Sequence, residues 1–347
     1  MPAPSPLPLT APFTPLSGAN ARDLVARTHG LVVDSMTRLP TERDDTFLVS
    51  TSLGRFVAKF AHPHDSVTEL ADQLAVLSAL DRSYPQLPVQ RIVATVDNSL
   101  MASVVDEAGQ SRQVRVLTYL DGEPLGARPR PLEVMRELGA LHARLATAIA
   151  DIGDGTTPRL LGSPTPWNLL AVDHYAPLVH HVADADVRHL VREVVDDARD
   201  ALLPAARTLP ALLAHNDLHG DNVLVRSEPF AITGVLDFGD MTRTPRVADL
   251  AVAASYARGR VGDAGEPWGA ARAYVAGFET EQPLTDDEHA LLPGLVVLRI
   301  AQRAILNSAI AAANPTAAEY ASRNLSAIAR DLRELRQSIP STIGARA

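Results

Sequence analysis

Four polar side chains in the second half of the chain have the types and spacing that one reaction needs. His215 and Asp217 lie one residue apart, and Asn222 follows the aspartate by five residues. Asp237 comes next, after a stretch that reads as a hairpin, and begins the sequence DFG. Phosphoryl transfer uses such a set: one aspartate orients an alcohol and accepts its proton, while an amide oxygen and a second carboxylate hold Mg²⁺. Each part alone is weak, since Asp or Asn in a loop often only caps a turn, but the shared order and spacing favour this chemistry.

Lys59 is the only lysine in a chain with 32 lysine and arginine residues. It lies in the apolar run GRFVAKFAH, residues 54–62, which reads as a strand. A compact ammonium on such a strand suits the α and β phosphates of a nucleotide, whereas the wider planar guanidinium of arginine fits that place poorly. The alternative is a lysine whose charged end reaches solvent at a strand edge. We expect Lys59 to contact phosphates.

The first part of the chain predicts a small sheet that carries helices. The spacing of apolar residues over 66–80 is helical, and Ser66 followed by Glu69 is a capping box. Short strands joined by turns are expected on either side of this helix. The expected helices are 19–29 and 66–80, and the expected strands are 32–38, 46–50, 55–60, 91–96, 100–105 and 113–119.

After Asp121–Pro124 the pattern becomes helical, with one β interruption formed by NVLVR and ITGVLDF. The expected helices are 131–150, 185–207, 246–258, 266–278, 286–312 and 316–337. The fold class is therefore α+β, with a small β-rich N-lobe and a larger, mainly helical C-lobe. The predicted divisions are a Pro-rich tail at 1–18, a nucleotide-binding N-lobe at 19–120 and a C-lobe at 121–347 that carries the catalytic loop and the substrate cleft.

Composition limits the partners. The net charge of −9 and the pI of about 5.6 argue against a general nucleic-acid binder, which needs a basic face. The absence of cysteine excludes disulfides and fits a cytoplasmic protein. The N-terminal MPAPSPLPLTAPFTPL lacks the basic start of a signal peptide. The longest apolar run, 291–313, is interrupted by Arg299 and Arg303, so we expect no membrane association. The oligomeric state does not follow from the sequence.

The arrangement resembles the aminoglycoside phosphotransferase and choline kinase-like superfamily, which shares the bilobal protein-kinase-like fold. The resemblance covers roughly residues 20–335. Within it, TERDDTFLV, LDFGDMTRTPRVADLAVAASYA and PLTDDE look closest to hydroxylysine kinase-like proteins. This resemblance implies a kinase for a small amino alcohol or hydroxylated amino acid, with ATP or GTP as the phosphate donor.

The resemblance also implies roles for the motif residues. Asp217 would be the catalytic base, and Asn222 and Asp237 would bind Mg²⁺. Lys59 would contact phosphates and pair with Glu69 on the following helix. For Glu69 the alternative is a role in the capping box alone, with the neighbouring positions 72 or 73 better placed to meet the lysine.

Three further roles are implied for structural support and for the nucleotide base. His215 would brace the catalytic loop, and Asp249 would brace the larger lobe. Residues 117–120 would form the hinge, where backbone groups of Thr118 and Leu120 meet the base.

The stretch LPTERDDTF, residues 39–47, departs from the protein-kinase pattern because it has no glycine. This departure argues against a protein kinase. Since acidic groups repel phosphates, Asp44 and Asp45 are expected to point away from the nucleotide or to pair with Arg43. Thr46 stands where close relatives often have Asn.

The candidates for acceptor contacts are less sharply defined. Asp240 suits a substrate ammonium or a structural hydrogen bond to the loop. Arg299 suits a substrate carboxylate or burial against acidic residues such as those at the start of its own helix. His219 either touches substrate or is a solvated loop residue, and Trp167 either lines the substrate cleft or packs in the core.

The sequence thus predicts a small-molecule kinase that moves the γ-phosphoryl group of a nucleotide to a hydroxyl of a small, amine-bearing acceptor. Two alternatives stay open. One is an antibiotic phosphotransferase of the aminoglycoside type, which needs a broad acidic cleft. The other is a pseudokinase-like nucleotide-binding protein, although Lys59, Asp217, Asn222 and Asp237 are all present.

Overall fold

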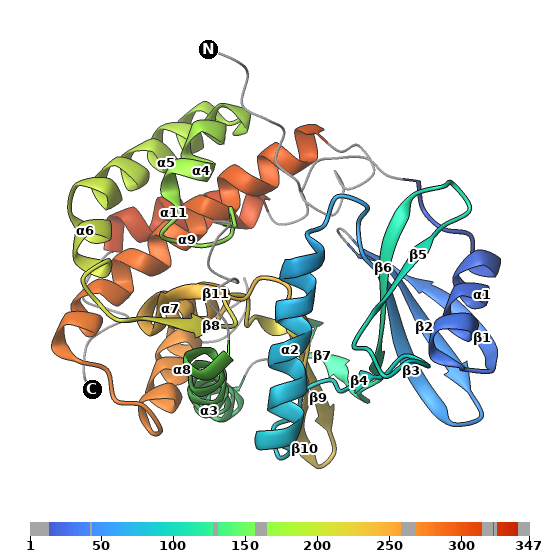
Figure 1. The fold of residues 1–347 in the computed structure, drawn as a ribbon. Coiled ribbons are helices and arrows are strands. Elements are labelled where there is room, and N and C mark those ends of the chain that lie inside the picture. Colours follow the sequence, from blue (N-terminus) through green and yellow to red (C-terminus); the bar gives the residue numbers. More distant parts are fainter. Residues whose placement is uncertain are drawn as a thin grey trace. The chain divides into compact units, whose positions relative to one another are not determined.

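The structure, a computed structural model, divides into two compact units, Met1–Asp121 and Gly122–Ala347. Figure 1 shows the chain coloured along its sequence. The residues that the structure describes are 14–41, 44–127, 131–156, 165–257, 268–313, 322 and 325–338. Most of the predicted Pro-rich tail therefore lies outside the described residues, as do Glu42 and Arg43 of the loop before the second strand.

The first unit is built on a six-stranded antiparallel sheet. Its strands are β1 (Val33–Leu39), β2 (Asp45–Thr51), β3 (Gly54–Phe60), β4 (Ile92–Val93), β5 (Ala102–Val105) and β6 (Ser111–Thr118). The path across the sheet is β1-β2-β3-β6-β4, and β5 also pairs with β6. The hairpin predicted between β2 and β3 is confirmed, with Thr51 opposite Gly54. The predicted strand at 91–96 shortens to two residues.

Helix α1 (Gly18–His29) covers one face of this sheet (Figure 1). Its buried side chains share a core with inward-facing residues of β2, β3 and β6, because these strands alternate apolar residues toward the helix. The core members from α1 and these strands include Ala21, Leu24, Val25, Phe47, Val49, Ala58, Phe60, Val114 and Val116. This packing holds the middle strand, β3, in place.

Helix α2 (Val67–Ser83) begins as the sequence predicts. The Ser66 hydroxyl accepts the backbone N–H of Glu69 at 3.2 Å, which satisfies one of the free donors of the first turn. Its buried face carries Leu70, Leu74 and Leu77 at helical spacing. The predicted helix over 66–80 is therefore confirmed and runs three residues longer.

The second unit is mainly helical. Its helices are α3 (Leu132–Thr156), α4 (Val172–Tyr175), α5 (Ala185–Asp197), α6 (Leu203–Ala206), α7 (Arg246–Tyr256), α8 (Gly269–Glu279), α9 (Asp286–Ala313) and α11 (Leu325–Ser338). Its short strands are β7 (Glu123–Pro124), β8 (Ala211–Ala214), β9 (Val223–Ser227), β10 (Phe230–Val235) and β11 (Thr242–Pro245). The helix predicted over 185–207 is interrupted by a π-helical segment, Ala198–Leu202. The α+β fold class is confirmed.

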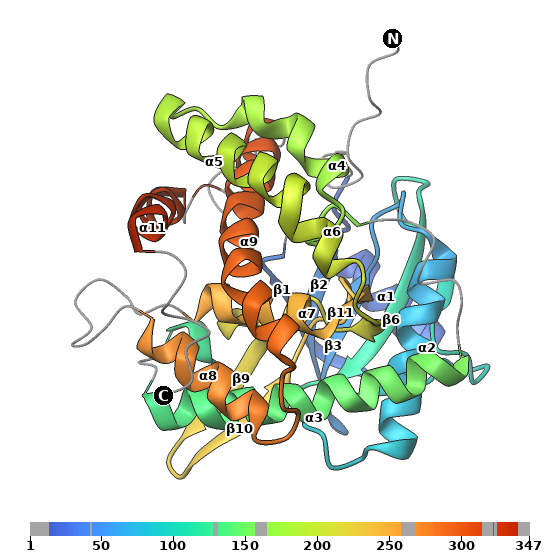
Figure 2. The ribbon, with the colours of Figure 1, turned by 90° about the vertical axis from the view of Figure 1, so that its left-hand side faces the viewer.

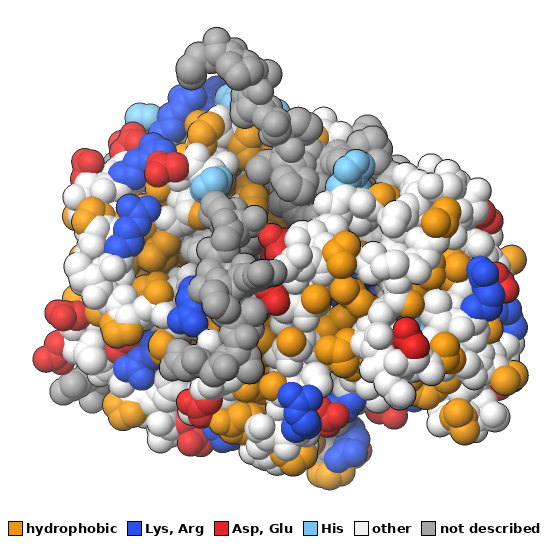
Figure 3. Space-filling view, viewed as in Figure 1, with side chains coloured by type: hydrophobic (Ala, Val, Ile, Leu, Met, Phe, Trp, Pro, Cys, Tyr) orange, Lys and Arg blue, Asp and Glu red, His pale blue; other side chains and the backbone are white. Residues whose placement is uncertain are grey.

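Helix α9 is the central helix of this unit, flanked in Figure 2 by α5 and α11. By length and composition it is apolar enough to cross a membrane, but 83% of its most apolar window is buried inside the protein. In the part of the chain that the structure describes, α9 is therefore a core helix. On the face drawn in Figure 3, basic and acidic side chains are interspersed over the helical unit.

Helices α3 and α8 run side by side in both ribbon views (Figures 1 and 2). They approach closely because each presents a glycine to the other. A Cβ atom at Gly139 would lie 1.9 Å from the carbonyl oxygen of Tyr274, and one at Gly277 would lie 2.0 Å from that of Arg136. No larger residue fits either place without moving backbone, so the two glycines set the distance between these helices.

Candidate active site

The candidate catalytic loop lies between short strands of the second unit. Strand β8, paired with β11, leads into His215, and a single helical turn, Gly220–Asn222, leads out into β9. The predicted hairpin of β9 and β10 is confirmed and returns the chain to Asp237. A hydrogen bond from the N–H of Leu236 to the carbonyl of Asn222, 2.8 Å, joins the two ends. Asn222 and Asp237 are thereby brought to the same end of the hairpin.

His215 ties the loop to the segment that carries Asp237. Its Nδ1 accepts the N–H of Asp217 at 3.3 Å, so the ring hydrogen lies on Nε2, which donates to the carbonyl of Leu236 at 3.2 Å. The ring also meets Phe238 edge-on, 4.8 Å between centroids. Burial lowers the pKa of His215 below its usual value, so the imidazole stays neutral. The expected bracing contact is present.

Asp249, on α7, holds the loop from the other side. Its Oδ1 accepts the N–H of Asn216 at 2.8 Å, and its Oδ2 lies 2.9 Å from His142 Nε2. Burial alone would raise the pKa of Asp249, but the histidine and the backbone N–H hold it below its ordinary value. His142, on α3, is fully buried, and both of its ring nitrogens have partners. Its Nδ1 lies 2.9 Å from the hydroxyl of Tyr274 on α8.

The carboxylate of Asp217 is held by three side chains. Asn222 Nδ2 donates to Oδ2 at 2.9 Å, and His219 Nε2 lies 3.3 Å from the same oxygen. Arg299 Nη2 donates to Oδ1 at 3.3 Å. His219 Nδ1 accepts the N–H of Asp221, so its ring hydrogen lies on Nε2 and points at the carboxylate. Each oxygen of Asp217 therefore has a fixed place.

This arrangement leaves one oxygen of Asp217 open to an acceptor hydroxyl. Carboxylate oxygens have about two accepting positions each. Oδ2 uses both, whereas Oδ1 receives a single donor among the described residues. Burial raises the pKa of Asp217, but the His219 and Arg299 donors outweigh burial and lower it below its usual value. Asp217 is therefore an ionised carboxylate with Oδ1 as its accepting atom.

Arg299 reaches Asp217 from the middle of α9. Its side chain is buried, and Nη1 donates to the carbonyl of Trp167 at 3.0 Å and to Gln302 Oε1 at 2.8 Å. Its guanidinium also lies 5.0 Å from the centroid of the Trp167 ring. The carboxylate that Arg299 meets is thus Asp217, from a distant part of the chain. Its predicted contact with a substrate carboxylate stays a prediction, as does a cleft-lining role for the buried Trp167.

An aromatic ring extends this cluster away from Asp217. His219 stacks on Tyr256, at the end of α7, with centroids 4.6 Å apart and planes 25° apart. Arg303, one turn beyond Arg299, lies with its guanidinium 3.9 Å from the Tyr256 centroid. His219 is half-buried here and is not a freely solvated loop residue. Its contact with substrate is untested.

The predicted metal ligands have suitable oxygens. Asn222 Nδ2 donates to the backbone carbonyl and to Oδ2 of Asp217, both at 2.9 Å, so the amide oxygen is left without a hydrogen bond among the described residues. Asp237 is exposed and has a positive φ of 60°, which turns its side chain out of the strand direction. Asp240 follows on the same segment and is half-buried. An amide oxygen and a carboxylate suit a hard cation.

In the first unit, Lys59 lies on β3 as expected. The carboxylate near it is that of Asp44, with Oδ2 at 3.9 Å from Nζ. Asp44 thus faces Lys59, and its orientation relative to a bound nucleotide stays a prediction. Glu69 is observed in the cap of α2, and its pairing with Lys59 stays a prediction.

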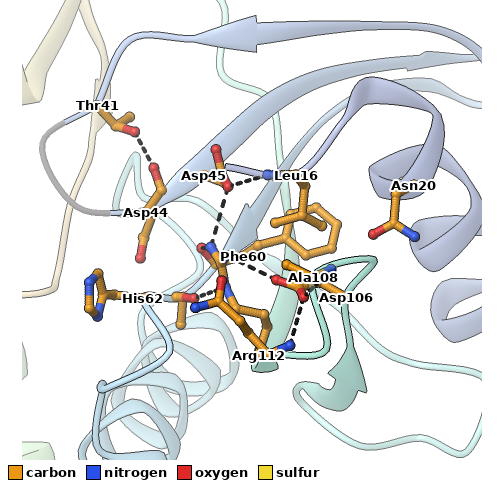
Figure 4. Close-up of polar contacts among 12 residues, drawn as sticks. Leu16, Asn20, Thr41, Asp44, Asp45, Phe60, His62, Asp106, Ala108 and Arg112 are labelled. Atoms are coloured by element: carbon orange, nitrogen blue, oxygen red, sulfur yellow. Dashed lines mark hydrogen bonds and ion pairs between the residues drawn. The ribbon is translucent and has the colours of Figure 1, made fainter. Parts of the chain in front are cut away.

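Asp45 lies elsewhere, in a buried polar cluster drawn in Figure 4. Its Oδ2 accepts the N–H of Leu16 at 2.9 Å and lies 3.4 Å from Arg112 Nη2. The same nitrogen donates to the carbonyl of Phe60, and Arg112 Nη1 reaches Asp106. Asp45 is thus held by this cluster, and its orientation relative to a bound nucleotide stays a prediction. The pairing with Arg43 lies outside the described residues. The cluster fixes the end of β3, on which Lys59 stands.

The predicted hinge has one occupied and one open position. The N–H and carbonyl of Thr118 bond to the carbonyl of Arg91, 2.8 Å, and to Gln90 Nε2, 3.1 Å. Leu120 is half-buried and has no backbone hydrogen bond among the described residues. Of the two predicted base contacts, Leu120 is the one with backbone groups to offer. Both remain predictions.

Sequence reasoning missed several residues that contact the site. Asn216, Tyr256 and Gln302 are joined to it only by tertiary packing, and no local pattern marks them. One signal was available for Asn216: an Asn between His215 and Asp217 tolerates the positive φ of 63° found there.

Comparisons with known proteins agree with this geometry. A model described as "Phosphotransferase enzyme family" matches residues 36–290. The chain is 27% identical over 316 residues to hydroxylysine kinase of Danio rerio, covering 88% of this chain and 87% of that protein. Among solved structures, an amicoumacin kinase in complex with AMP-PNP, Ca²⁺ and Ami has a TM-score of 0.68 at 17% identity, covering 90% of this chain and 92% of that one. A microcompartment-associated aminopropanol kinase has a TM-score of 0.66 at 21% identity, covering 95% and 99%.

Fold and site together define a kinase that uses an alcohol as acceptor. The family match spans well over half of the chain, and the chain therefore belongs to the phosphotransferase enzyme family. It is a small-molecule phosphotransferase with a protein-kinase-like fold.

Proposed function

We propose that this protein transfers the γ-phosphoryl group of ATP or GTP to a hydroxyl of a small, amine-bearing acceptor. The acceptor class is an amino alcohol or a hydroxylated amino acid such as hydroxylysine. The observation that carries the proposal is the open accepting position on Asp217 Oδ1, in a carboxylate whose other oxygen is fully occupied. The names of the relatives, a hydroxylysine kinase and an aminopropanol kinase, support an acceptor with an amine.

The role of Asp217 follows from its geometry and charge. The acceptor hydroxyl donates its hydrogen bond to Oδ1, which aims the hydroxyl oxygen. As that oxygen bonds to the γ-phosphorus, the bond from phosphorus to the nucleotide's bridging oxygen breaks, and the hydroxyl proton passes to Oδ1. The low pKa makes Asp217 a weak base, so it takes the proton late, which suits a loose transition state.

The amine would be recognised by acidic groups close to Asp217. Asp240 lies three residues after Asp237, on the segment that the β9–β10 hairpin returns to the loop. A half-buried carboxylate suits the ammonium group of such an acceptor.

A divalent cation fits the donor set, and we propose Mg²⁺. Asn222 would offer its amide oxygen and Asp237 its carboxylate. When bound, Mg²⁺ neutralises charge on the transferring phosphate. Among the described residues no group of three or more His, Asp or Glu could hold a metal alone. The remaining ligands would therefore come from the nucleotide phosphates and water, as is usual for Mg²⁺.

The test measures nucleotide consumption by the purified protein with ATP and GTP separately. The acceptors are hydroxylysine, ethanolamine, choline, homoserine, aminopropanol and a set of aminoglycosides, with Asp217→Asn as the blank. We expect turnover that depends on a small amine-bearing acceptor and disappears in the blank. Turnover with aminoglycosides alone would support the antibiotic phosphotransferase instead. Tight nucleotide binding without turnover on any acceptor would support a nucleotide-binding protein and contradict the proposal.

A further inference from the structure

Lys59 is the middle residue of a row that crosses three strands. It lies directly opposite Thr46 of β2 and directly opposite Arg115 of β6. Residues directly opposite in antiparallel strands point to the same face of the sheet. Thr46, Lys59 and Arg115 therefore present their side chains on one face, and we call them the Lys59 row.

Both outer members of the Lys59 row have a buried polar atom without a partner. Arg115 is 9% exposed and Thr46 is 3% exposed. Among the described residues, neither Arg115 Nη1 nor Thr46 Oγ1 has a hydrogen-bond partner. Leaving such a group unpaired costs about 1–3 kcal/mol, so native proteins rarely do so without a reason. Both atoms can donate, and a ligand with several acceptor oxygens would satisfy them together.

The charge at this place points to an anion. Asp44 Oδ2 lies 2.7 Å from Arg115 Nη2 and 3.9 Å from Lys59 Nζ, so one carboxylate is shared by two cations. The three side chains are 11–16% exposed. Because these side chains are largely shielded from solvent, an ion pair between them is stronger than it would be in water. The shared carboxylate occupies the position where an anionic ligand would meet both cations.

We propose that Arg115 and Thr46 bind the polyphosphate of the nucleotide together with Lys59, and that Asp44 competes with it for the two cations. The proposal rests on the nucleotide donor of the proposed function. A guanidinium can take two phosphate oxygens at once, which the single lysine cannot do with the same geometry. In the absence of nucleotide, the Asp44 carboxylate takes the place of a phosphate group beside Lys59 and Arg115. Nucleotide must displace this carboxylate, so its affinity is lower than it would be without Asp44.

The test measures binding of ADP, inorganic tripolyphosphate and adenosine to the full chain by calorimetry. Arg115→Gln should weaken ADP and tripolyphosphate about 10–100-fold and leave adenosine unchanged. Asp44→Asn should have the opposite sign and tighten both phosphate ligands about 3–10-fold. The matched controls are Arg27→Gln and Asp23→Asn, which break an exposed ion pair in the same unit, 2.8 Å long, and should change neither affinity.

Arg115→Lys keeps the positive charge but lacks the two-pronged guanidinium. This variant tests the role of Arg115 if Arg115→Gln does not fold. It should bind tripolyphosphate more weakly than the parent protein. Unchanged tripolyphosphate affinity in a folded Arg115 variant, or weaker binding by Asp44→Asn, would overturn the proposal. These readouts are independent of turnover. The parent protein could bind tripolyphosphate and ADP as described but phosphorylate no acceptor. This result would contradict the proposed function and would still support phosphate binding by the Lys59 row.

Discussion

Arg299 Nη2 lies 3.3 Å from Asp217 Oδ1, although 82 residues of chain separate them. The arginine is buried and its other terminal nitrogen is committed to Trp167 and Gln302. A guanidinium held this way cannot rotate freely, so the carboxylate that it meets is fixed as well. Arg299 therefore fixes the position of Asp217, the proposed acceptor of the substrate hydroxyl proton.

Replacing Arg299 by methionine should lower kcat about 10–100-fold and leave the KM for nucleotide nearly unchanged, because the aspartate loses its orientation. The guanidinium also lowers the pKa of Asp217. Its removal should raise that pKa, so the acidic limb of the pH profile should move to higher pH. An acidic limb at its original pH would contradict the electrostatic part of this role. Arg144→Met removes an exposed arginine and serves as the control.

Asp217→Asn should abolish turnover, with a loss of at least about 10³-fold in kcat, and should also destabilise the protein. Both carboxylate oxygens accept hydrogen bonds here, and an amide has a single oxygen. In either orientation the new NH₂ faces a donor, which costs about 1–3 kcal/mol. A turnover assay and chemical denaturation measure the two effects. The exposed Asp173→Asn, which also loses a carboxylate beside an arginine, should change neither.

Asp249→Asn should reduce both stability and kcat. One carboxylate oxygen accepts from His142 and the other accepts from the N–H of Asn216. Asparagine has a single side-chain oxygen and can replace only one of these acceptors. We expect a loss of about 3 kcal/mol in the free energy of unfolding, because a buried network is broken. The pKa of Asp249 lies below its usual value, so its contribution is present at neutral pH and is lost only as the pH falls below about 4. Urea titrations from pH 4 to pH 7 check this, and a variant as stable as the parent at pH 7 would refute it.

His29 should make the protein less stable in mild acid. Burial lowers its pKa from 6.5 to about 4, and its Nε2 has no partner among the described residues. The unfolded chain takes up the proton near pH 6.5, whereas the folded chain resists it until about pH 4. Stability is therefore full above pH 6.5 and falls by about 3 kcal/mol as the pH drops through this window. His29→Leu should flatten this slope, and His189→Leu, at an exposed position, should not.

Gly277→Ala should be severely destabilising, by more than about 3 kcal/mol, because its Cβ would lie 2.0 Å from a backbone oxygen of α3. Gly18→Ala is the control. No atom of the described residues lies within 4 Å of a Cβ there, and alanine in the first turn of α1 should be neutral or stabilising. Thermal unfolding of both variants measures the difference. Equal melting temperatures would show that α3 and α8 can separate at little cost.

The sequence was most informative where the site is local. His215, Asp217, Asn222 and Asp237 lie within one loop and hairpin, so their spacing along the chain already constrains their spacing in space. Helix periodicity and the Ser66 cap likewise report on contacts within a few residues. These features decided the fold class and the candidate catalytic loop.

What the sequence could not provide depends on residues far apart in the chain. The meeting of Arg299 with Asp217 requires the packing of α9, and the sharing of Asp44 by Lys59 and Arg115 requires the register of three strands. From the sequence Asp44 could be considered only as a charge near phosphate, because its arginine partner across the sheet, Arg115, is 71 residues away along the chain. Strands of two to four residues, such as β7 and β8, have too few side chains to show a period.

The chain of contacts from Tyr274 through His142 and Asp249 to the backbone of Asn216 draws on α8, α3 and α7 in turn. The shape of the loop is thus a property of the assembled helices and not of its own eight residues. During refolding, catalytic activity should therefore return only after the last of these three helices has docked, later than helical circular dichroism. The time at which enzyme activity returns would then report when the packing of the helical core is complete.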